Sequence, residues 1–309
     1  MFKVGCVGID TSHPGSFVKV MREAGLQLEY TEVYNDGFRT DQEVEAFMEL
    51  AGVSQRCTSL DEMAKSVDIA FIHDCNWDRH LELAAPFIEA GTPVFIDKPV
   101  VGNLAECRKL EALVKGGAKI LGGSSLRYAI EVGELRELLA DSKEQVIAML
   151  GTCGVDRFNY GIHIVEALHA IMGPGAKSVS YSGVTSTGNT DIEQYVVTWE
   201  SGAKVTYQLQ SGVWQPCHVM LQTDQAVHHR EIIIDNVYLA LLRYIQAVLE
   251  GTCEATDVYV QTEAIHIMLA GEASRLRDGA EIALKDLPEI PVHFDGNEFC
   301  NEYALANKP

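Results

Sequence analysis

The sequence predicts an α/β protein with two domains, a doubly wound parallel sheet followed by an α+β domain with a large, mostly antiparallel open sheet. A chain of 309 residues is long enough to bury two cores. Short apolar runs alternate with helical patterns over residues 1–122, which indicates repeated βα units. Longer alternating segments with short turns dominate afterwards. The flexible Gly122-Gly-Ser-Ser125 stretch divides the predicted domains, 1–122 and 123–309.

In the first domain, apolar β-branched runs predict the strands and amphipathic segments predict the helices between them. The expected strands cover residues 3–9, 28–34, 69–73, 94–96 and 119–122. The expected helices cover 14–24, 41–51, 78–90 and 104–115, with a short helix after the capping box Ser59-Leu-Asp-Glu62. Because each strand is followed by a helix, the sheet should be parallel.

The second domain should begin with helices and continue with a sheet. Helices are expected at 130–139 and 161–172, with a strand at 145–152 between them. Further strands should cover 178–186, 192–199 and 203–209, with two more up to about residue 234. Helices at 236–250 and 258–276 should cover one face of this sheet.

Composition narrows the class of protein. The formal net charge of −20 disfavours binding to nucleic acid or to an anionic membrane surface. No apolar stretch approaches the roughly 20 residues of a membrane helix, and a strand at the amino terminus argues against a signal peptide. The eight cysteines form no CxxC pair, so we expect no metal site, no disulfide scaffold and a reducing, cytoplasmic location.

The loop after the first strand stands where a Rossmann-like fold carries G-x-G-x-x-G. Only its first glycine is present, in the sequence Gly8-Ile9-Asp10-Thr11-Ser12-His13. Asp10 adds a charge where pyrophosphate approaches the backbone, but the helix N-terminus and two hydroxyl side chains still suit a phosphate. The alternative is that these polar residues only cap the helix.

Two further strand ends carry polar candidates. Asn35 and Asp36 follow the second strand, where an acid binds the adenosine ribose and disfavours a 2′-phosphate; they also fit an ordinary turn. Lys98 follows the strand Val94–Ile96, because Pro99 cannot continue it. This places Lys98 at the ligand-binding edge of an open sheet.

Three segments, taken together and in order, resemble the Gfo/Idh/MocA family of oxidoreductases. They are Asp74-Cys-Asn76-Trp-Asp-Arg-His80, Ile96-Asp97-Lys98-Pro99 and Asn159-Tyr160-Gly161-Ile-His163. Their order and spacing match the family from about residue 3 to residue 287. The resemblance implies an NAD(P)-dependent dehydrogenase or reductase acting on a sugar, cyclitol or related hydroxy compound, with NAD favoured over NADP.

The resemblance also implies roles for individual residues. Lys98 would stabilise the developing alkoxide, His163 would act as base and Asn159 would stand in place of the family's aspartate. The cofactor side would comprise the Gly8–His13 loop with Asn35, Asp36, Asn76, His80 and Asp97. The substrate side would comprise Arg127, Tyr128 and Tyr160. A homodimer or homotetramer through the second sheet is expected, because an aromatic face of Tyr181, Tyr195, Trp199 and Tyr207 would need cover.

The departures from the family pattern keep a second hypothesis open. Asp10 and His13 replace glycines of the family's dinucleotide-binding loop, and Asn159 replaces the family's catalytic aspartate, which takes part in proton transfer. The alternative is therefore a non-redox protein on the same scaffold: a ligand sensor, or a lyase or hydrolase that recycles bound NAD.

Overall fold

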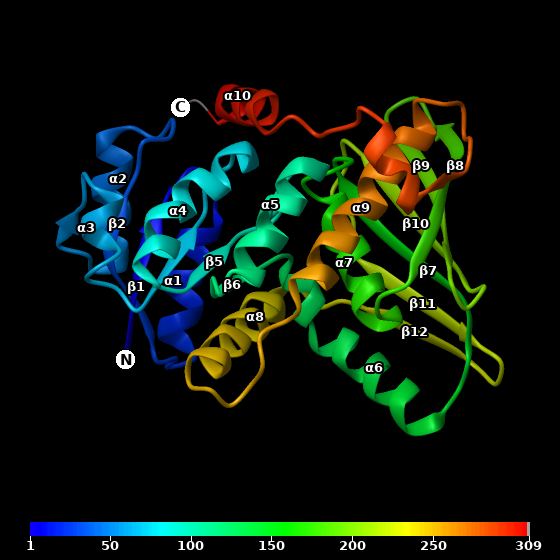
Figure 1. Ribbon diagram of the computed structural model, residues 1–309, viewed down its shortest axis with the longest axis horizontal. Coiled ribbons are helices and arrows are strands. Elements are labelled where there is room, and N and C mark those ends of the chain that lie inside the picture. Colours follow the sequence, from blue (N-terminus) through cyan, green and yellow to red (C-terminus); the bar gives the residue numbers. More distant parts are fainter. Residues whose placement is uncertain (308–309) are drawn as a thin grey trace.

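The computed structural model describes residues 1–307 and contains two sheets side by side (Figure 1). The first sheet is parallel, in the order β3-β2-β1-β4-β5-β6. Its strands are β1 (Phe2–Val7), β2 (Leu28–Tyr34), β3 (Gln55–Arg56), β4 (Ile69–Ile72), β5 (Val94–Ile96) and β6 (Ile120–Gly122). The predicted doubly wound parallel sheet is confirmed, with β3 as a short added edge strand.

Helices cover both faces of this sheet. The helices of this part of the chain are α1 (His13–Glu23), α2 (Asp41–Ala51), α3 (Leu60–Met63), α4 (His80–Ala90) and α5 (Leu104–Lys115), with the 3-10 turn η1 (Trp77–Arg79) before α4. Apolar residues of α1 and α2 pack on one face and those of α3, α4 and α5 on the other. The caps explain two of the starts: the Thr40 side chain accepts from Glu43 N–H, and Ser59 accepts from Glu62 N–H.

The second sheet has the order β12-β11-β7-β10-β9-β8-β13, antiparallel except for the β7–β10 pair. Its strands are β7 (Val146–Val155), β8 (Ala176–Ser186), β9 (Asp191–Trp199), β10 (Lys204–Ser211), β11 (His218–Thr223), β12 (Val227–Glu231) and β13 (Ile282–Ala283). The remaining helical elements are η2 (Ser125–Tyr128), α6 (Ile130–Ser142), α7 (Gly161–Met172), α8 (Ile234–Leu249), α9 (Val258–Arg275), η3 (Leu284–Glu289) and α10 (Gly296–Ala306). The predicted mostly antiparallel open sheet is confirmed.

The aromatic face of this sheet is not where we expected it. Tyr195, Trp199 and Tyr207 are at most 4% exposed, because they point toward the helix-covered side, where Ala264, Ile265 and Met268 of α9 belong to the same core. The expectation of an exposed aromatic face is therefore wrong. The open face instead carries half-buried Gln194, Thr206 and Gln208, with the Gln208 amide donating to Gln194 at 3.2 Å.

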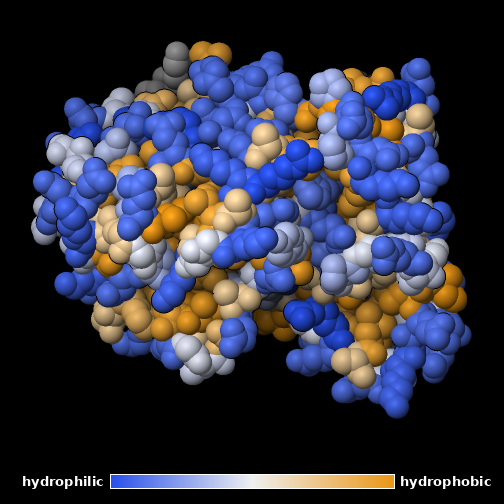
Figure 2. All heavy atoms as spheres, in the orientation of Figure 1, coloured by the Kyte–Doolittle hydropathy of each residue, from blue (hydrophilic) through white to orange (hydrophobic). Residues whose placement is uncertain are grey.

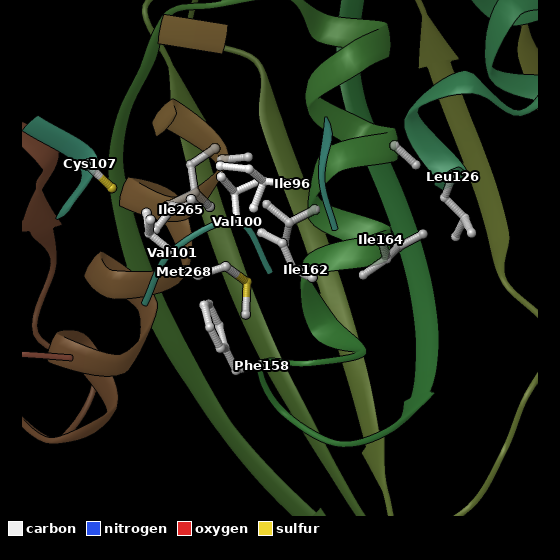
Figure 3. Close-up of a cluster of buried hydrophobic side chains, with 14 of the residues drawn as sticks. Ile96, Val100, Val101, Cys107, Leu126, Phe158, Ile162, Ile164, Ile265 and Met268 are labelled. Atoms are coloured by element: carbon white, nitrogen blue, oxygen red, sulfur yellow. The ribbon is translucent and has the colours of Figure 1, made fainter. Parts of the chain in front are cut away.

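One hydrophobic core joins the two sheets. Ile96 and Val100, from the first sheet and the loop after it, belong to the same buried cluster as Ile162 and Ile164 of α7 and Met268 of α9 (Figure 3). Ile96 and Val100 flank Lys98, and Ile162 and Ile164 flank His163. Because a close-packed core is stiff, this cluster fixes the lysine relative to the histidine.

Two helices from the carboxyl-terminal half pack against the first sheet. Leu241, Leu242 and Ile245 of α8 join the core of α1 and α2. After η3 the chain crosses back, and α10 lies over the first sheet (Figure 1). The division into domains 1–122 and 123–309 stays a prediction, and its last residues, 308–309, lie outside the described part.

Candidate active site

Lys98 lies at the carboxyl end of β5, as the strand pattern predicts. The side-chain ammonium donates to two oxygens of Asn159, the side-chain Oδ1 at 2.8 Å and the backbone carbonyl at 3.1 Å. It also stands 5.2 Å from the centre of the Tyr160 ring. Burial lowers the pKa of Lys98, although the nearby carboxylates of Asp97 and Asp156 act in the opposite direction.

His163 lies on the first turn of α7, on the other side of Tyr160. Its ring centre is 5.6 Å from that of Tyr160, and its Nδ1 lies 2.6 Å from the Ser124 hydroxyl. The Ser124 oxygen also accepts the N–H of Leu126 at 3.1 Å, and its hydroxyl can either accept a proton from His163 Nδ1 or donate one to it. Burial, together with the positive charge of Lys98, holds the pKa of His163 well below its ordinary value. His163 is therefore neutral at neutral pH.

A carboxylate that the sequence analysis missed supports Asn159. Asp156 accepts the Asn159 side-chain amide at 3.2 Å and the backbone N–H of Tyr160 at 2.9 Å. Asp156, three residues before Asn159, thus supplies the negative charge that an asparagine cannot provide. An aspartate so close to Asn159 could have been singled out from the sequence. That its carboxylate turns toward Asn159 is visible only in the structure.

Asp97 lies in a buried histidine cluster rather than facing open space. Its Oδ2 accepts from Nδ1 of both His13, at 2.7 Å, and His73, at 2.8 Å, and Nε2 of His73 meets the Tyr30 hydroxyl at 2.9 Å. Burial acts to raise the pKa of Asp97, but the two histidines hold it well below its ordinary value. His73 was missed because it reads as the last residue of a buried strand. The cluster fixes His13, which replaces a glycine of the dinucleotide loop.

Two cavities meet around these side chains. The first has a volume of about 50 Å³ and the second about 100 Å³. His13 and Tyr160 line both, whereas Lys98 and Asn159 line the first and His163 the second. The site therefore consists of two adjoining cavities, with Lys98 in the first, His163 in the second and Tyr160 lining both.

Two features that bind a pyrophosphate are present in the glycine loop: the turn at Gly8 and the open N-terminus of α1. Gly8 has φ +84°, and a Cβ there would lie 2.9 Å from the Asp74 nitrogen, so this position requires glycine. The first turn of α1 holds no acidic residue, and Ser12 makes no capping bond with any described residue. Thr11 and Ser12 line the first cavity. The helix N-terminus is thus open to an anion.

Asp10 turns away from that helix end. Its side chain is buried against Gly37, and its backbone carbonyl accepts from Arg39 at 2.8 Å. Burial, and then the charge of Asp74, raise the pKa of Asp10 to about 6. The carboxylate therefore does not stand in the path of a phosphate, which was the main objection to NAD from the sequence.

The residues after β2 fit a ribose. Asn35 accepts the backbone N–H of Ile9 at 3.0 Å, which ties this strand end to the glycine loop. The half-exposed Asp36 carboxylate accepts from Arg79 at 2.6 Å and from Tyr34 at 3.2 Å. Taken together, the Gly8 turn, the α1 N-terminus and Asp36 fit a dinucleotide.

Helix α10 occupies the mouth of the same cleft. Phe299 and Tyr303 line the first cavity beside Thr11 and Ser12. Phe299 packs on Trp77, with ring centres 4.9 Å apart, and Asp78 accepts the N–H of Gly296 at 2.8 Å. The first cavity, of about 50 Å³, has room for a few water molecules but not for a pyrophosphate, so we expect α10 to move when a dinucleotide binds at the α1 N-terminus.

Several predicted site residues serve other contacts. Asn76 caps η1 by accepting the Asp78 N–H, and both ring nitrogens of His80 lie at 3.0 Å or less from backbone carbonyls, of Val100 and Asp74. These two residues shape the loop after β4. Their side chains line neither cavity within residues 1–307.

Arg127 and Tyr128 also lie outside both cavities in the described part of the chain. The Arg127 guanidinium forms a buried ion pair with Glu166 at 2.8 Å. Tyr128 stacks on Tyr244 of α8, with ring centres 4.2 Å apart. The structure therefore does not bring these two predicted substrate residues to the site, whereas Tyr160 is at its centre.

Comparison with known proteins agrees with this geometry. The sequence model of a family described as "Oxidoreductase family, NAD-binding Rossmann fold" (Gfo/Idh/MocA) matches residues 2–122. The N-terminal part of the chain is therefore similar to this family of NAD-binding oxidoreductases. The similarity agrees with the parallel sheet and with the Gly8 turn.

The similarity to individual proteins is distant. The chain is 29% identical over 174 residues to the protein assigned as the UDP-kanosamine synthase oxidoreductase subunit of Amycolatopsis mediterranei (strain S699). That match covers 50% of this chain and 48% of the relative, so it spans about half of each.

Solved structures are similar over nearly the whole chain. GenD2 from gentamicin A biosynthesis, solved with NAD, has a TM-score of 0.77 and 17% identity, covering 91% of this chain and 96% of its own. Scyllo-inositol dehydrogenase from Lactobacillus casei, solved with NAD(H) and scyllo-inositol, has a TM-score of 0.78 and 11% identity, covering 92% and 99%. At these identities the likeness establishes the fold of both domains. Within residues 1–307, no helix has the length and apolar character to cross a membrane.

Proposed function

We propose that this protein is an NAD-dependent dehydrogenase or reductase that acts on a sugar, cyclitol or related hydroxy compound. The observation that carries the proposal is the pair Lys98 and His163, fixed by one core on either side of Tyr160. An ammonium donor and a neutral imidazole at one passage are the groups that alcohol oxidation needs.

Lys98 is the group proposed to stabilise the oxygen of the reacting carbinol. Its two hydrogen bonds to Asn159 aim the ammonium and leave one N–H for a ligand. A fixed cation in a site with little water stabilises a developing alkoxide more strongly than solvent does. The Asp156 carboxylate supports this arrangement by holding the Asn159 amide.

His163 is proposed to take the proton of the substrate hydroxyl. We propose the tautomer in which Nδ1–H donates to Ser124, which leaves Nε2 as the acceptor, and the lowered pKa keeps the ring neutral. In the reverse direction the same nitrogen returns the proton. Ser124 is thus a positioning residue that selects the tautomer.

When bound, the nicotinamide ring would accept or supply the hydride. In this chain Gly8, Thr11, Ser12 and the α1 N-terminus are proposed to hold the pyrophosphate, and Asp36 the adenosine ribose. We propose NAD rather than NADP, because the Asp36 carboxylate would repel a 2′-phosphate and Arg79 is already paired with Asp36 and Asp74.

The second cavity suggests the class of substrate. Its described lining includes His163, Tyr160, Trp214, Gln215 and Tyr238, and neither lysine nor arginine is among them. Aromatic faces and neutral polar groups suit an uncharged polyol better than a phosphate or carboxylate ester. A small neutral sugar or cyclitol is therefore the proposed substrate.

The proposal is tested by measuring NADH formation from NAD with a panel of uncharged sugars and cyclitols, in the wild type and in Lys98→Ala. A substrate-dependent rise in NADH absorbance in the wild type alone supports it. Calorimetry at millimolar concentrations of NAD and of NADP runs in parallel. If neither dinucleotide binds, the dehydrogenase proposal is abandoned.

A second candidate function is a ligand-binding protein without net redox turnover, or an enzyme that recycles its NAD. Helix α10 favours this candidate, because Phe299 and Tyr303 stand in the mouth of the dinucleotide cleft. Binding of a sugar with no change in NADH absorbance, under conditions where NAD is bound, would select it. Conversion of the sugar at constant NAD would select the recycling enzyme.

The assembly and location are also proposals. We propose a homodimer or homotetramer through the open face of the second sheet. We also propose a reducing compartment such as the cytoplasm, because the eight cysteines form no CxxC pair.

A further inference from the structure

Three potential metal ligands meet above the first sheet, outside the Lys98–His163 pair. They are Asp10 in the loop after β1, Cys75 after β4 and Cys300 on α10, and one ligand atom of each lies within 4.8 Å of the other two. Cys75 Sγ is 2.8 Å from Cys300 Sγ and 3.9 Å from Asp10 Oδ2. Three segments that are remote in sequence therefore converge on one point.

The Asp10 carboxylate is buried, with one of its oxygens unsatisfied among residues 1–307. The residue is 1% exposed, and its Oδ1 makes no hydrogen bond to any residue in the described part of the chain. The Arg39 guanidinium donates to the Asp10 backbone carbonyl, at 2.8 and 3.2 Å, and to the Glu43 carboxylate, at 2.9 Å. Arg79 is engaged by Asp36 and Asp74. A buried carboxylate with an unpartnered oxygen is costly, and a bound cation relieves that cost.

The donor set defines which cation fits. Two thiols and one carboxylate favour a thiophilic ion with tetrahedral preference, because Mg²⁺ and Ca²⁺ select oxygen ligands. A disulfide between the two cysteines would leave Asp10 Oδ1 without a partner among the described residues, whereas a metal ion would be bound by all three side chains. We propose that Asp10, Cys75 and Cys300 form a three-ligand site for Zn²⁺.

Loading the site needs a small adjustment of the side chains. Both thiols release their protons to solvent as they become ligands. The sulfur atoms must separate by ~1 Å, because two Zn–S bonds of about 2.3 Å at a tetrahedral angle span nearly 4 Å. Cys300 is only half-buried and can turn toward solvent. A water molecule or an external ligand completes the fourth position.

The site has a consequence for the fold. It links α10 to the loops after β1 and β4, which are the walls of the dinucleotide cleft. The metal therefore holds α10 over the cleft. Sequence spacing hides the site, because Cys75 lies 65 positions from Asp10 and 225 from Cys300.

The test uses the full chain, reduced, stripped of metal with a chelator and titrated with Co²⁺. We expect one Co²⁺ per chain, with a sulfur-to-cobalt charge-transfer band that disappears when Zn²⁺ is added. Cys75→Ser and Cys300→Ser should lose the band, and Asp10→Asn should weaken Co²⁺ binding at least 10-fold. Cys253→Ser, at an exposed cysteine far from the cluster in sequence, is the matched control and should behave as the wild type.

Two outcomes overturn the site. One is a Co²⁺ titration without a thiolate band while Cys75 and Cys300 react freely with a thiol reagent. The other is a Cys75–Cys300 disulfide in protein isolated without reductant and without bound metal. Circular dichroism checks that each variant folds. If Asp10→Asn does not fold, the result for Cys300→Ser decides, because Cys300 is only half-buried. Neither readout depends on NAD or turnover, so the dehydrogenase proposal stands or fails separately.

Discussion

At the scale of single residues, Lys98 carries the largest share of the proposed chemistry. Lys98→Ala removes the ammonium while Asn159 and Tyr160 remain in place. We expect kcat to fall by about 10²–10³-fold, the usual effect of removing one preorganised donor to an oxyanion. The measurement is NADH formation at saturating NAD, with the melting temperature recorded alongside.

The matched control is Lys65→Ala, at an exposed lysine of the same sheet domain. It should leave both kcat and the melting temperature unchanged. Full turnover by Lys98→Ala, with a normal melting temperature, would contradict the proposed role.

His163 sets the second residue-scale prediction, the pH dependence of kcat/KM. The base must be unprotonated, and burial and Lys98 lower its pKa, so activity should fall only as the pH drops well below 6.5. His163→Asn should remove this acidic limb along with most of the activity. Ser124→Ala should keep the limb but lower kcat, because the tautomer is no longer selected.

An acidic limb that persists in His163→Asn would assign the titration to another group. The His13–Asp97–His73 cluster is the nearest source of one. His169, whose Nε2 lies 2.6 Å from Glu263 at the far end of α7, offers the control: His169→Gln should leave the shape of the profile unchanged.

Residues differ in how far sequence alone could assign them. Lys98 and His163 were predictable because their motifs fix both the element and the position on it. The positions of the Arg127 and Tyr128 side chains were not predictable, because the direction in which a side chain leaves a short 3-10 turn depends on its packing partners. Here Glu166 holds Arg127, and Tyr244 holds Tyr128, away from the cavities.

His73 acts through Tyr30 and Asp97, which are distant in sequence, so no local pattern encodes its role. Asp156 contacts residues three and four positions later, so its nearness to the motif was a signal that sequence reasoning could have used.

At the scale of elements, α10 is the helix that the sequence analysis did not predict. Its start signal is present, since Asp295 accepts the Glu298 N–H at 2.7 Å. Its position over the first sheet depends on distant contacts, such as Asp78 with Gly296 and Trp77 with Phe299. A Cβ at Gly296 would lie 2.7 Å from the Asn76 side-chain oxygen, so this approach requires glycine.

Removal of α10 should raise the affinity for NAD. A chain ending at Phe294 keeps the stacked Phe158–Phe294 pair but opens the first cavity. If the closed position dominates in the wild type, the apparent Kd is raised by the inverse of the open fraction. We expect metal-free truncated protein to bind NAD at least 10-fold more tightly by calorimetry.

A substitution on the outer side of α10 provides the control for this experiment. Leu305 is 65% exposed, so Leu305→Ala should not change the affinity for NAD. Equal affinity of the truncated and full chains would mean that α10 does not compete with the dinucleotide.

At the scale of the whole molecule, both sheets were predicted from the sequence because the hydrophobic pattern of their strands is clear. Continuous apolar runs indicated the parallel sheet, and alternation indicated the second sheet. The period does not say which face of a sheet is covered, since both faces of β9 carry apolar residues: Tyr195 and Val197 are buried, and Val196 is half-buried. This is why the exposed aromatic face was predicted wrongly.

The packing of the two halves also lay beyond the sequence. Helix α8 packs on α1 and the core of the first sheet, and α10 lies beside η1, above α4 in Figure 1. Figure 2 shows hydrophilic residues over much of the face viewed in Figure 1, with smaller hydrophobic areas between them. One buried cluster contains residues of both halves, so separating the two sheets would expose the interior that holds the site.

The last prediction concerns the open face of the second sheet. Val196, Thr206, Leu150 and Met220 stand opposite one another on four neighbouring strands, in a row bordered by Gln194, Gln208 and Gln222. Met220 is 40% exposed in the single chain. A flat face with an apolar centre and amide rim is suited to a symmetric contact with a second copy.

We expect the wild type to be a dimer or tetramer by light scattering, and Leu150→Arg to shift it toward the monomer. Two copies of the arginine would face each other near the symmetry axis, where burying unpaired like charges is costly. Leu276→Arg, at a position 61% exposed beyond the end of α9, should keep the wild-type mass. A monomeric wild type at micromolar concentration would show that this face is not an interface between copies.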